Sequence, residues 1–153
     1  MSEPRNDPSL PVVAIDLYHG IIPPNIGELL RQRAFLQRNP FEIRLLNTRL
    51  ADDTLANTDV FIVASMGHTS DIHFKEPEIG VIDAFVRGGG GLLCAGQAWS
   101  WVYPSYGNKS VETFPLNELG NRLGFKITGK NIGSPVLYPS EITAGINVVT
   151  QNH

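Results

Sequence analysis

Cysteine is almost absent from this chain of 153 residues, since Cys94 is the only one. A single cysteine excludes an internal disulfide and any zinc or iron–sulfur site built from several cysteines. It also favours a reducing, cytoplasmic environment. Basic residues do not predominate either, with 12 Lys and Arg against 15 Asp and Glu. The sequence therefore lacks the basic footprint of a nucleic-acid-binding protein and the polybasic run that attracts anionic lipid.

Long apolar runs are missing as well. No segment approaches the ~20 apolar residues that cross a bilayer, so we expect no membrane partner. Residues 1–11 (MSEPRNDPSLP) have no apolar core of the kind found in a signal peptide, and their prolines indicate a disordered arm. We expect one domain over residues 12–153, and its abrupt end at QNH suggests truncation at the C-terminus.

What the chain does contain is an alternation of strand-like and helix-like segments. Short apolar runs predict strands, and one-sided apolar patterns that follow a breaker predict helices. The predicted strands are 12–17, 41–46, 59–65, 92–95 and 125–128, with a further one near 146–149. The predicted helices are 25–39, a short one within 47–58, 77–87 and 115–123. This alternation predicts a flavodoxin-like three-layer α/β sandwich with a mainly parallel sheet in the strand order 2-1-3-4-5.

Polar side chains follow three of the predicted strands. In the predicted order, the C-terminal ends of strands one, three and four lie side by side, at the crevice where such sheets bind ligands. The residues that we expect to bind a ligand there are Asp16, His19, His68, Gln97 and Trp99. The two tryptophans, Trp99 and Trp101, either stack on a sugar or flat ligand or close over the core.

Cys94 lies where the fourth predicted strand turns into the next segment. A side chain at such a bend is pushed out of the sheet, and nearby backbone N–H groups lower a thiol pKa. One hypothesis is therefore a nucleophilic Cys94 with His68 or His19 as its general base. The alternative is a small buried residue that ends a strand.

The histidines allow two further interpretations. His19, His68 and His73, with Asp16 or Asp71, have the ligand types that hold a divalent metal. The alternative is that these loop histidines only bond to the backbone, because their spacing matches no familiar helical pair. Both interpretations stay open at this stage.

The segment 81–124 resembles a known family. A helix leads into GGGLL at 89–93, followed by GQAW at 96–99, a second tryptophan at 101 and FPLN at 114–117. These features resemble the class I glutamine amidotransferase-like superfamily, and most closely the domain found in TRP-channel-associated factors. The segment ITAGI at 142–146 resembles ThuA-like members, and CAG at 94–96 resembles the elbow of PfpI-like members.

The resemblance implies a domain without glutaminase chemistry. Active amidotransferases of that superfamily carry their cysteine in a G-x-C-x-G elbow, but Leu92 stands in place of the first glycine. They also need a late His-x-Glu, and the only late histidine, His153, ends the chain. PfpI-like members use a glutamate after the first strand, and the nearest here is Glu28, inside a predicted helix.

The sequence therefore predicts a non-glutaminase amidotransferase-like domain that works without a cofactor. Its expected role is to bind a small polar ligand, a sugar or a partner protein at the C-terminal edge of the sheet. One alternative is a PfpI-like thiol hydrolase or deglycase that uses Cys94. A second alternative is a metal-assisted hydrolase that uses the His19, His68 and His73 cluster. The low content of charged residues, 18%, is compatible with a homodimer.

Overall fold

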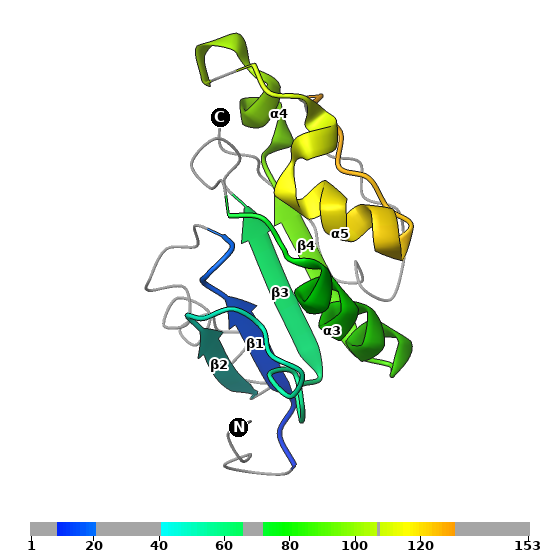
Figure 1. Ribbon diagram of the computed structural model, residues 1–153. Coiled ribbons are helices and arrows are strands. Elements are labelled where there is room, and N and C mark those ends of the chain that lie inside the picture. The colour runs from blue at the N-terminus through cyan, green and yellow to red at the C-terminus, as the bar shows by residue number, and fades with distance from the viewer. Residues whose placement is uncertain (1–8, 21–40, 66–71, 107, 131–153) are drawn as a thin grey trace, which may run out of the picture.

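A computed structural model describes residues 9–20, 41–65, 72–106 and 108–130 of the chain (Figure 1). Within these residues, four parallel strands form one sheet in the order β2-β1-β3-β4. The strands are β1 (Val12–Asp16), β2 (Glu42–Leu46), β3 (Val60–Ser65) and β4 (Gly91–Gly96). The helices are α3 (Glu76–Arg87), α4 (Ala98–Val102) and α5 (Pro115–Leu123), with short 3-10 turns η2 (Pro104–Tyr106) and η3 (Val111–Thr113). The predicted α/β class, parallel sheet and order of the first four strands are confirmed.

The register of the strands brings their C-terminal ends to one edge of the sheet. Asp16 at the end of β1 pairs with Leu46 at the end of β2. Ser65 at the end of β3 pairs with Gly96 at the end of β4. The loops that leave these strands therefore start next to one another, as the parallel topology requires.

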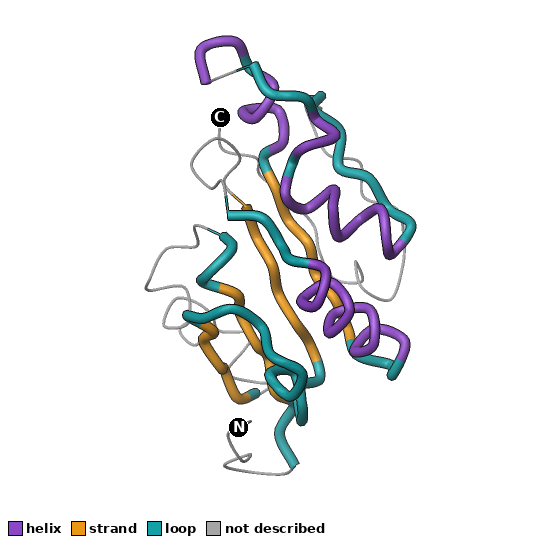
Figure 2. Tube along the Cα trace, in the orientation of Figure 1, coloured by secondary structure: helices purple, strands orange, loops and turns teal. Residues whose placement is uncertain are grey.

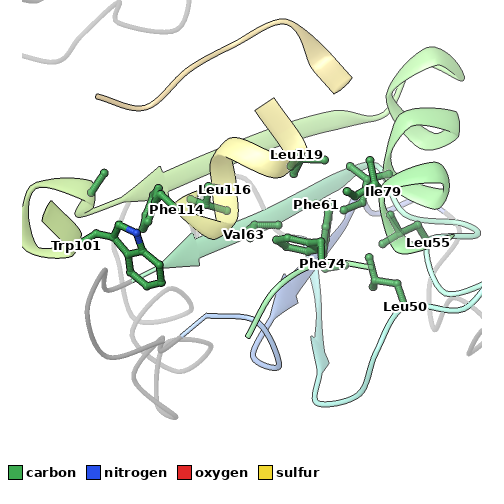
Figure 3. Close-up of a cluster of buried hydrophobic side chains, with 13 residues drawn as sticks. Leu50, Leu55, Phe61, Val63, Phe74, Ile79, Trp101, Phe114, Leu116 and Leu119 are labelled. Carbon is green, nitrogen blue, oxygen red and sulfur yellow. The ribbon is translucent and has the colours of Figure 1, made fainter. Parts of the chain in front are cut away.

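One face of the sheet carries the main described core. Alternate side chains of β3 point to this face, where α3 and α5 cover them (Figure 1). Each large aliphatic or aromatic side chain that is fully buried there contributes about 1.5–3 kcal/mol. The cluster is drawn in Figure 3, and its most deeply buried members include Phe61, Val63, Ile82, Trp101, Phe114, Leu116 and Leu119.

The predicted fifth strand, 125–128, is wrong. Gly124 ends α5 in the left-handed conformation, with φ of 83°, and the next N–H, that of Phe125, bonds back to Gly120 O. The side chain of Asn117 then satisfies both backbone groups of Ile127, because its amide donates to Ile127 O and its oxygen accepts from Ile127 N. An asparagine side chain on α5 thus takes the place of a neighbouring strand at Ile127.

The predicted short helix within 47–58 is also wrong. This crossover from β2 to β3 consists of successive turns, which Figure 2 shows as loop. Thr54 Oγ1 accepts a hydrogen bond from Ala51 N, and Asn57 adopts a positive φ of 57°. Local side-chain hydrogen bonds and a left-handed residue both compete with regular helix.

The predicted helices at 77–87 and 115–123 are confirmed as α3 and α5. Glycine ends both of them, Gly88 after α3 and Gly124 after α5. The predicted helix 25–39 and strand near 146–149 lie outside the described residues, as does most of the expected arm at 1–11. None of the described helices is long and apolar enough to cross a membrane.

Candidate functional site

The loop after β1 lies directly against the end of β3. A Cβ atom on Gly20 would stand 1.6 Å from the carbonyl oxygen of Ala64, so only glycine fits at this point. The close approach places the imidazole of His19 against the ring of Phe74, which precedes α3. The two rings stack with centroids 4.0 Å apart and an interplanar angle of 19°. The described parts of the segments that follow β1 and β3 are therefore packed against each other.

Asp16 and His19 form a buried pair at this edge of the sheet. Their exposed fractions are 0% and 1%. His19 Nδ1 lies 2.8 Å from Asp16 Oδ2, and because a carboxylate only accepts, Nδ1 carries the proton. The other oxygen of Asp16 accepts from the backbone N–H groups of Tyr18 and His19. The aspartate thus fixes both the turn after β1 and the orientation of the imidazole.

Glu78, in the first turn of α3, faces the opposite side of the His19 ring. Its Oε1 atom lies 3.1 Å from His19 Nε2, a contact that forms an ion pair when the imidazole is protonated. The Arg49 guanidinium donates to Glu78 Oε2 at 2.6 Å. The backbone N–H groups of Leu50 and Lys75 donate to the same carboxylate at 3.1 and 2.9 Å. Glu78 therefore ties together the loops that follow β1, β2 and β3.

The surroundings of Glu78 favour its charged form. Burial alone raises the pKa of a carboxyl group. The hydrogen bond from Lys75 N–H, the nearby His19 and the hydrogen bonds from Arg49 and Leu50 outweigh burial, and they hold the pKa of Glu78 below its ordinary value of 4.5. A buried, ionised glutamate is thus a fixed part of this edge.

We call Asp16, His19, Arg49 and Glu78 the buried polar network. Because three of its members are at least 97% buried, its position points to a structural role in joining loops rather than to contact with a substrate. Asp16 and His19 were predicted from the sequence to lie at this edge, and the structure brings them together. Glu78 and Arg49 were not predicted. The signal for Glu78 was its place at the third position of a helix with Pro77 in its first turn, a pattern in which glutamate caps the N-terminus.

Cys94 does not have the environment of an activated nucleophile. The thiol packs against the core cluster from β4, and burial raises its pKa to about 11. A nucleophilic thiol needs the opposite shift. Of the two bases considered for it, His19 has both ring nitrogens facing carboxylates, and His68 lies outside the described residues.

The segment after β4 presents aromatic side chains. Gln97 directly precedes α4 at the N-cap position, and its backbone N–H donates to Ser65 O at 3.0 Å. Trp101 is buried in the core, whereas Trp99 is 37% exposed. Trp99 packs edge-to-face with Tyr103, which is 52% exposed, at a centroid distance of 6.5 Å. The two tryptophans therefore separate into one core residue and one surface residue.

The side chain of His73 lies apart from the buried polar network. Its Nδ1 atom donates to Glu118 Oε1 on α5 at 2.8 Å, and its ring packs against Trp101. Across the described ranges, no three His, Cys, Asp or Glu side chains are grouped to hold a metal. Two residues of the metal hypothesis, His68 and Asp71, fall outside these ranges.

Comparison with known proteins identifies relatives. A family model described as "TRPM8, N-terminal domain" matches residues 47–141, more than half of the chain. The TRPM8 channel-associated factor 1 proteins of Homo sapiens and Pongo abelii are each 33% identical over 95 residues, which make up 60% of this chain. A TRPM8 channel-associated factor homolog of Danio rerio is 30% identical over 69 residues, 45% of this chain.

These relatives are much longer proteins. The matching segment makes up 10% of the human and orangutan proteins and 8% of the zebrafish protein. No solved structure matches the chain. The part of the sequence resemblance that points to channel-associated factors is confirmed, while the likeness to the wider amidotransferase-like superfamily stays a prediction.

Proposed function

The chain belongs to the family described as "TRPM8, N-terminal domain", and on that basis we propose that it is a protein-binding domain whose partner is a TRPM8-type channel. The names of the relatives support this partner, because those proteins are called channel-associated factors. The proposed contact surface is the exposed aromatic pair Trp99 and Tyr103 at the C-terminal edge of the sheet. We call this pair the aromatic surface.

The exposure of this pair is the observation that carries the proposal. Tryptophan and tyrosine are enriched at the centres of protein interfaces, where their large rings exclude water. Trp99 and Tyr103 leave 37% and 52% of their surface in solvent, although a buried tryptophan, Trp101, lies between them in the sequence. The short helix α4 thus anchors itself in the core through Trp101 and presents Trp99 outward, and Tyr103 follows directly at its C-terminal end.

The rest of the edge suits a binding platform better than an enzyme. The buried polar network joins the described parts of the loops after β1, β2 and β3. The raised pKa of Cys94 argues against thiol chemistry at neutral pH. A rigid scaffold with a small exposed aromatic group can bind a partner with little loss of conformational entropy.

The test is binding of the 153-residue chain to purified TRPM8 in lipid nanodiscs, followed by biolayer interferometry. The double variant Trp99→Ala, Tyr103→Ala should bind at least tenfold more weakly and keep a cooperative thermal transition. The matched control is Leu45→Ala, which removes an exposed apolar side chain of β2 and should change affinity less than twofold. If the unaltered chain does not bind, the partner is wrong. If the double variant binds normally, the surface is wrong.

A small polar ligand is the second candidate, and one observation favours it. Ser65, at the end of β3, is 3% exposed, and its hydroxyl has no hydrogen-bond partner within the described residues. A buried hydroxyl without a partner costs free energy that a ligand could recover. Thermal-shift measurements with a panel of monosaccharides and small carboxylates would test this candidate. A stabilising compound should lose its effect in Ser65→Ala.

A further inference from the structure

The crossover between β2 and β3 leaves a gap beside α3. In a sheet of this type, a parallel crossover is usually a helix that packs on the sheet next to the other helices. Here the crossover forms turns instead, on the same side of the sheet as α3 (Figure 2). Its side chains Leu50 and Leu55 share the core with Ile79 of α3, as Figure 3 shows. Within the described ranges, turns therefore occupy the place beside α3 where a crossover helix is usual.

The gap is an open groove of about 560 Å³. Leu55 and Ala56 of the crossover line one side, and Val81 and Phe85 of α3 are among the residues that line the other. The floor of the groove is thus apolar. An apolar groove of this kind, bounded by a helix, is the typical receptor for the apolar face of another helix.

The α3 wall of the groove allows close approach. Gly80 and Ala84 both line it and lie one helical turn apart. A Cβ atom on Gly80 would meet nothing within 4 Å, so the space above it is open. Small side chains at this spacing let the ridge of a second helix enter the groove between them.

The charge of the groove is negative. Asp52 is the one charged side chain among its described lining residues, and the neighbouring Asp53 is also exposed. The nearby cation Arg44 is only 7% exposed and is not among the residues that line the groove. Its guanidinium donates instead to Ala56 O and Thr58 Oγ1 within the crossover. A cationic partner therefore complements this edge of the groove.

We propose that this groove binds an amphipathic α-helix of a partner protein, with aliphatic side chains against Gly80 and Ala84 and a lysine or arginine beside Asp52. The wall from Pro77 to Phe85 is about 12 Å long at ~1.5 Å per residue, so about two turns of a partner helix span it. No lining residue belongs to the aromatic surface, so this inference does not depend on the proposed channel partner.

The probe is a fluorescein-labelled peptide of about four helical turns, with leucine and alanine on one face and lysines on the flanks. A second peptide carries glutamates in place of the lysines. Fluorescence anisotropy with the 153-residue chain should show tighter binding of the lysine peptide, by at least fivefold at low salt, and a smaller difference at high salt. Asp52→Lys should remove or reverse this preference.

Gly80→Leu is the decisive variant, because its side chain extends into the groove and leucine favours a helix over glycine by roughly 1 kcal/mol. It should bind the lysine peptide at least tenfold more weakly. The matched control is Asn121→Leu, which places the same side chain at an exposed position of α5 and should bind normally.

Three outcomes would overturn the proposal. Equal binding by Gly80→Leu and the unaltered chain would exclude the groove as the binding surface. Tighter binding of the glutamate peptide would exclude the cationic partner. Sedimentation that shows a dimer of the unaltered chain but a monomer of Gly80→Leu would make a second copy of the chain the occupant.

Discussion

Glu78 Oε1 lies 3.1 Å from His19 Nε2, and this contact joins the first turn of α3 to the loop after β1. The two side chains are 3% and 1% exposed, so solvent screens their interaction little. Each group also has a second partner: the imidazole of His19 hydrogen-bonds to Asp16, and the carboxylate of Glu78 hydrogen-bonds to Arg49. The C-terminal edge of the sheet is therefore held by ionic contacts as well as by the apolar core.

Replacement of Glu78 by glutamine should destabilise the protein. The change leaves His19 and Arg49 without their shared anion, and loss of one partner from a buried ionic cluster costs about 3 kcal/mol or more. Urea unfolding followed by circular dichroism measures the difference. The control is Glu76→Gln, since Glu76 pairs with Arg122 at the surface and its side chain is 72% exposed. That change should cost less than about 1 kcal/mol, and equal losses in the two variants would contradict the structural role of Glu78.

The stability of the protein should fall in acid because of Glu78. Its pKa in the folded protein is below the ordinary value of 4.5, so the folded state binds the proton less readily than the unfolded state. The stabilisation is complete above pH 4.5 and is lost as the pH falls through the lower, folded pKa. Urea unfolding at pH 7, 5, 4 and 3 should show the gap between the unaltered protein and Glu78→Gln narrowing below pH 4.5. A gap that stays constant to pH 3 would contradict the lowered pKa.

Cys94 should react slowly with iodoacetamide at neutral pH. A thiol with a pKa of about 11 is about one ten-thousandth thiolate at pH 7, and the thiolate is the reactive form. Alkylation followed by mass spectrometry should accelerate as the pH rises to 10, and it should be fast at pH 7 after unfolding in urea. Fast alkylation of the folded protein at pH 7 would instead support the thiol-enzyme alternative.

Two glycine-to-alanine changes should have opposite effects on the free energy of unfolding. Gly20→Ala puts a methyl group 1.6 Å from the Ala64 carbonyl oxygen, so the backbone after β1 must move. The free energy of unfolding should fall by about 1–3 kcal/mol or more, the usual cost of overpacking. Gly80→Ala adds a methyl group in open space within α3 and should stabilise by roughly 0.5–1 kcal/mol. Thermal unfolding of both variants measures these effects. A neutral Gly20→Ala would mean that the loop is not held against β3.

The strands and the two long described helices could be predicted because their signals are local. A short apolar run such as VFIVAS in β3 suits a buried strand, and Pro77 and Gly88 mark the two ends of α3. The two errors arose where side chains took over backbone hydrogen bonds. Asn117 occupies both polar groups of Ile127, and Thr54 accepts from Ala51 N. Such bonds depend on which segments meet, which a local pattern does not contain.

The sequence by itself determined the α/β class, the order of the first four strands and the placement of Asp16 and His19 at the C-terminal edge, because apolar periodicity and parallel topology fix these features. The tertiary structure decided what those residues do. Only the folded chain brings Glu78 and Arg49 to His19, partly buries Cys94 so that its pKa rises, and leaves Trp99 exposed while Trp101 is buried. The physical reason is that burial and charge depend on neighbours from several elements, and these neighbours are set by packing rather than by distance along the chain.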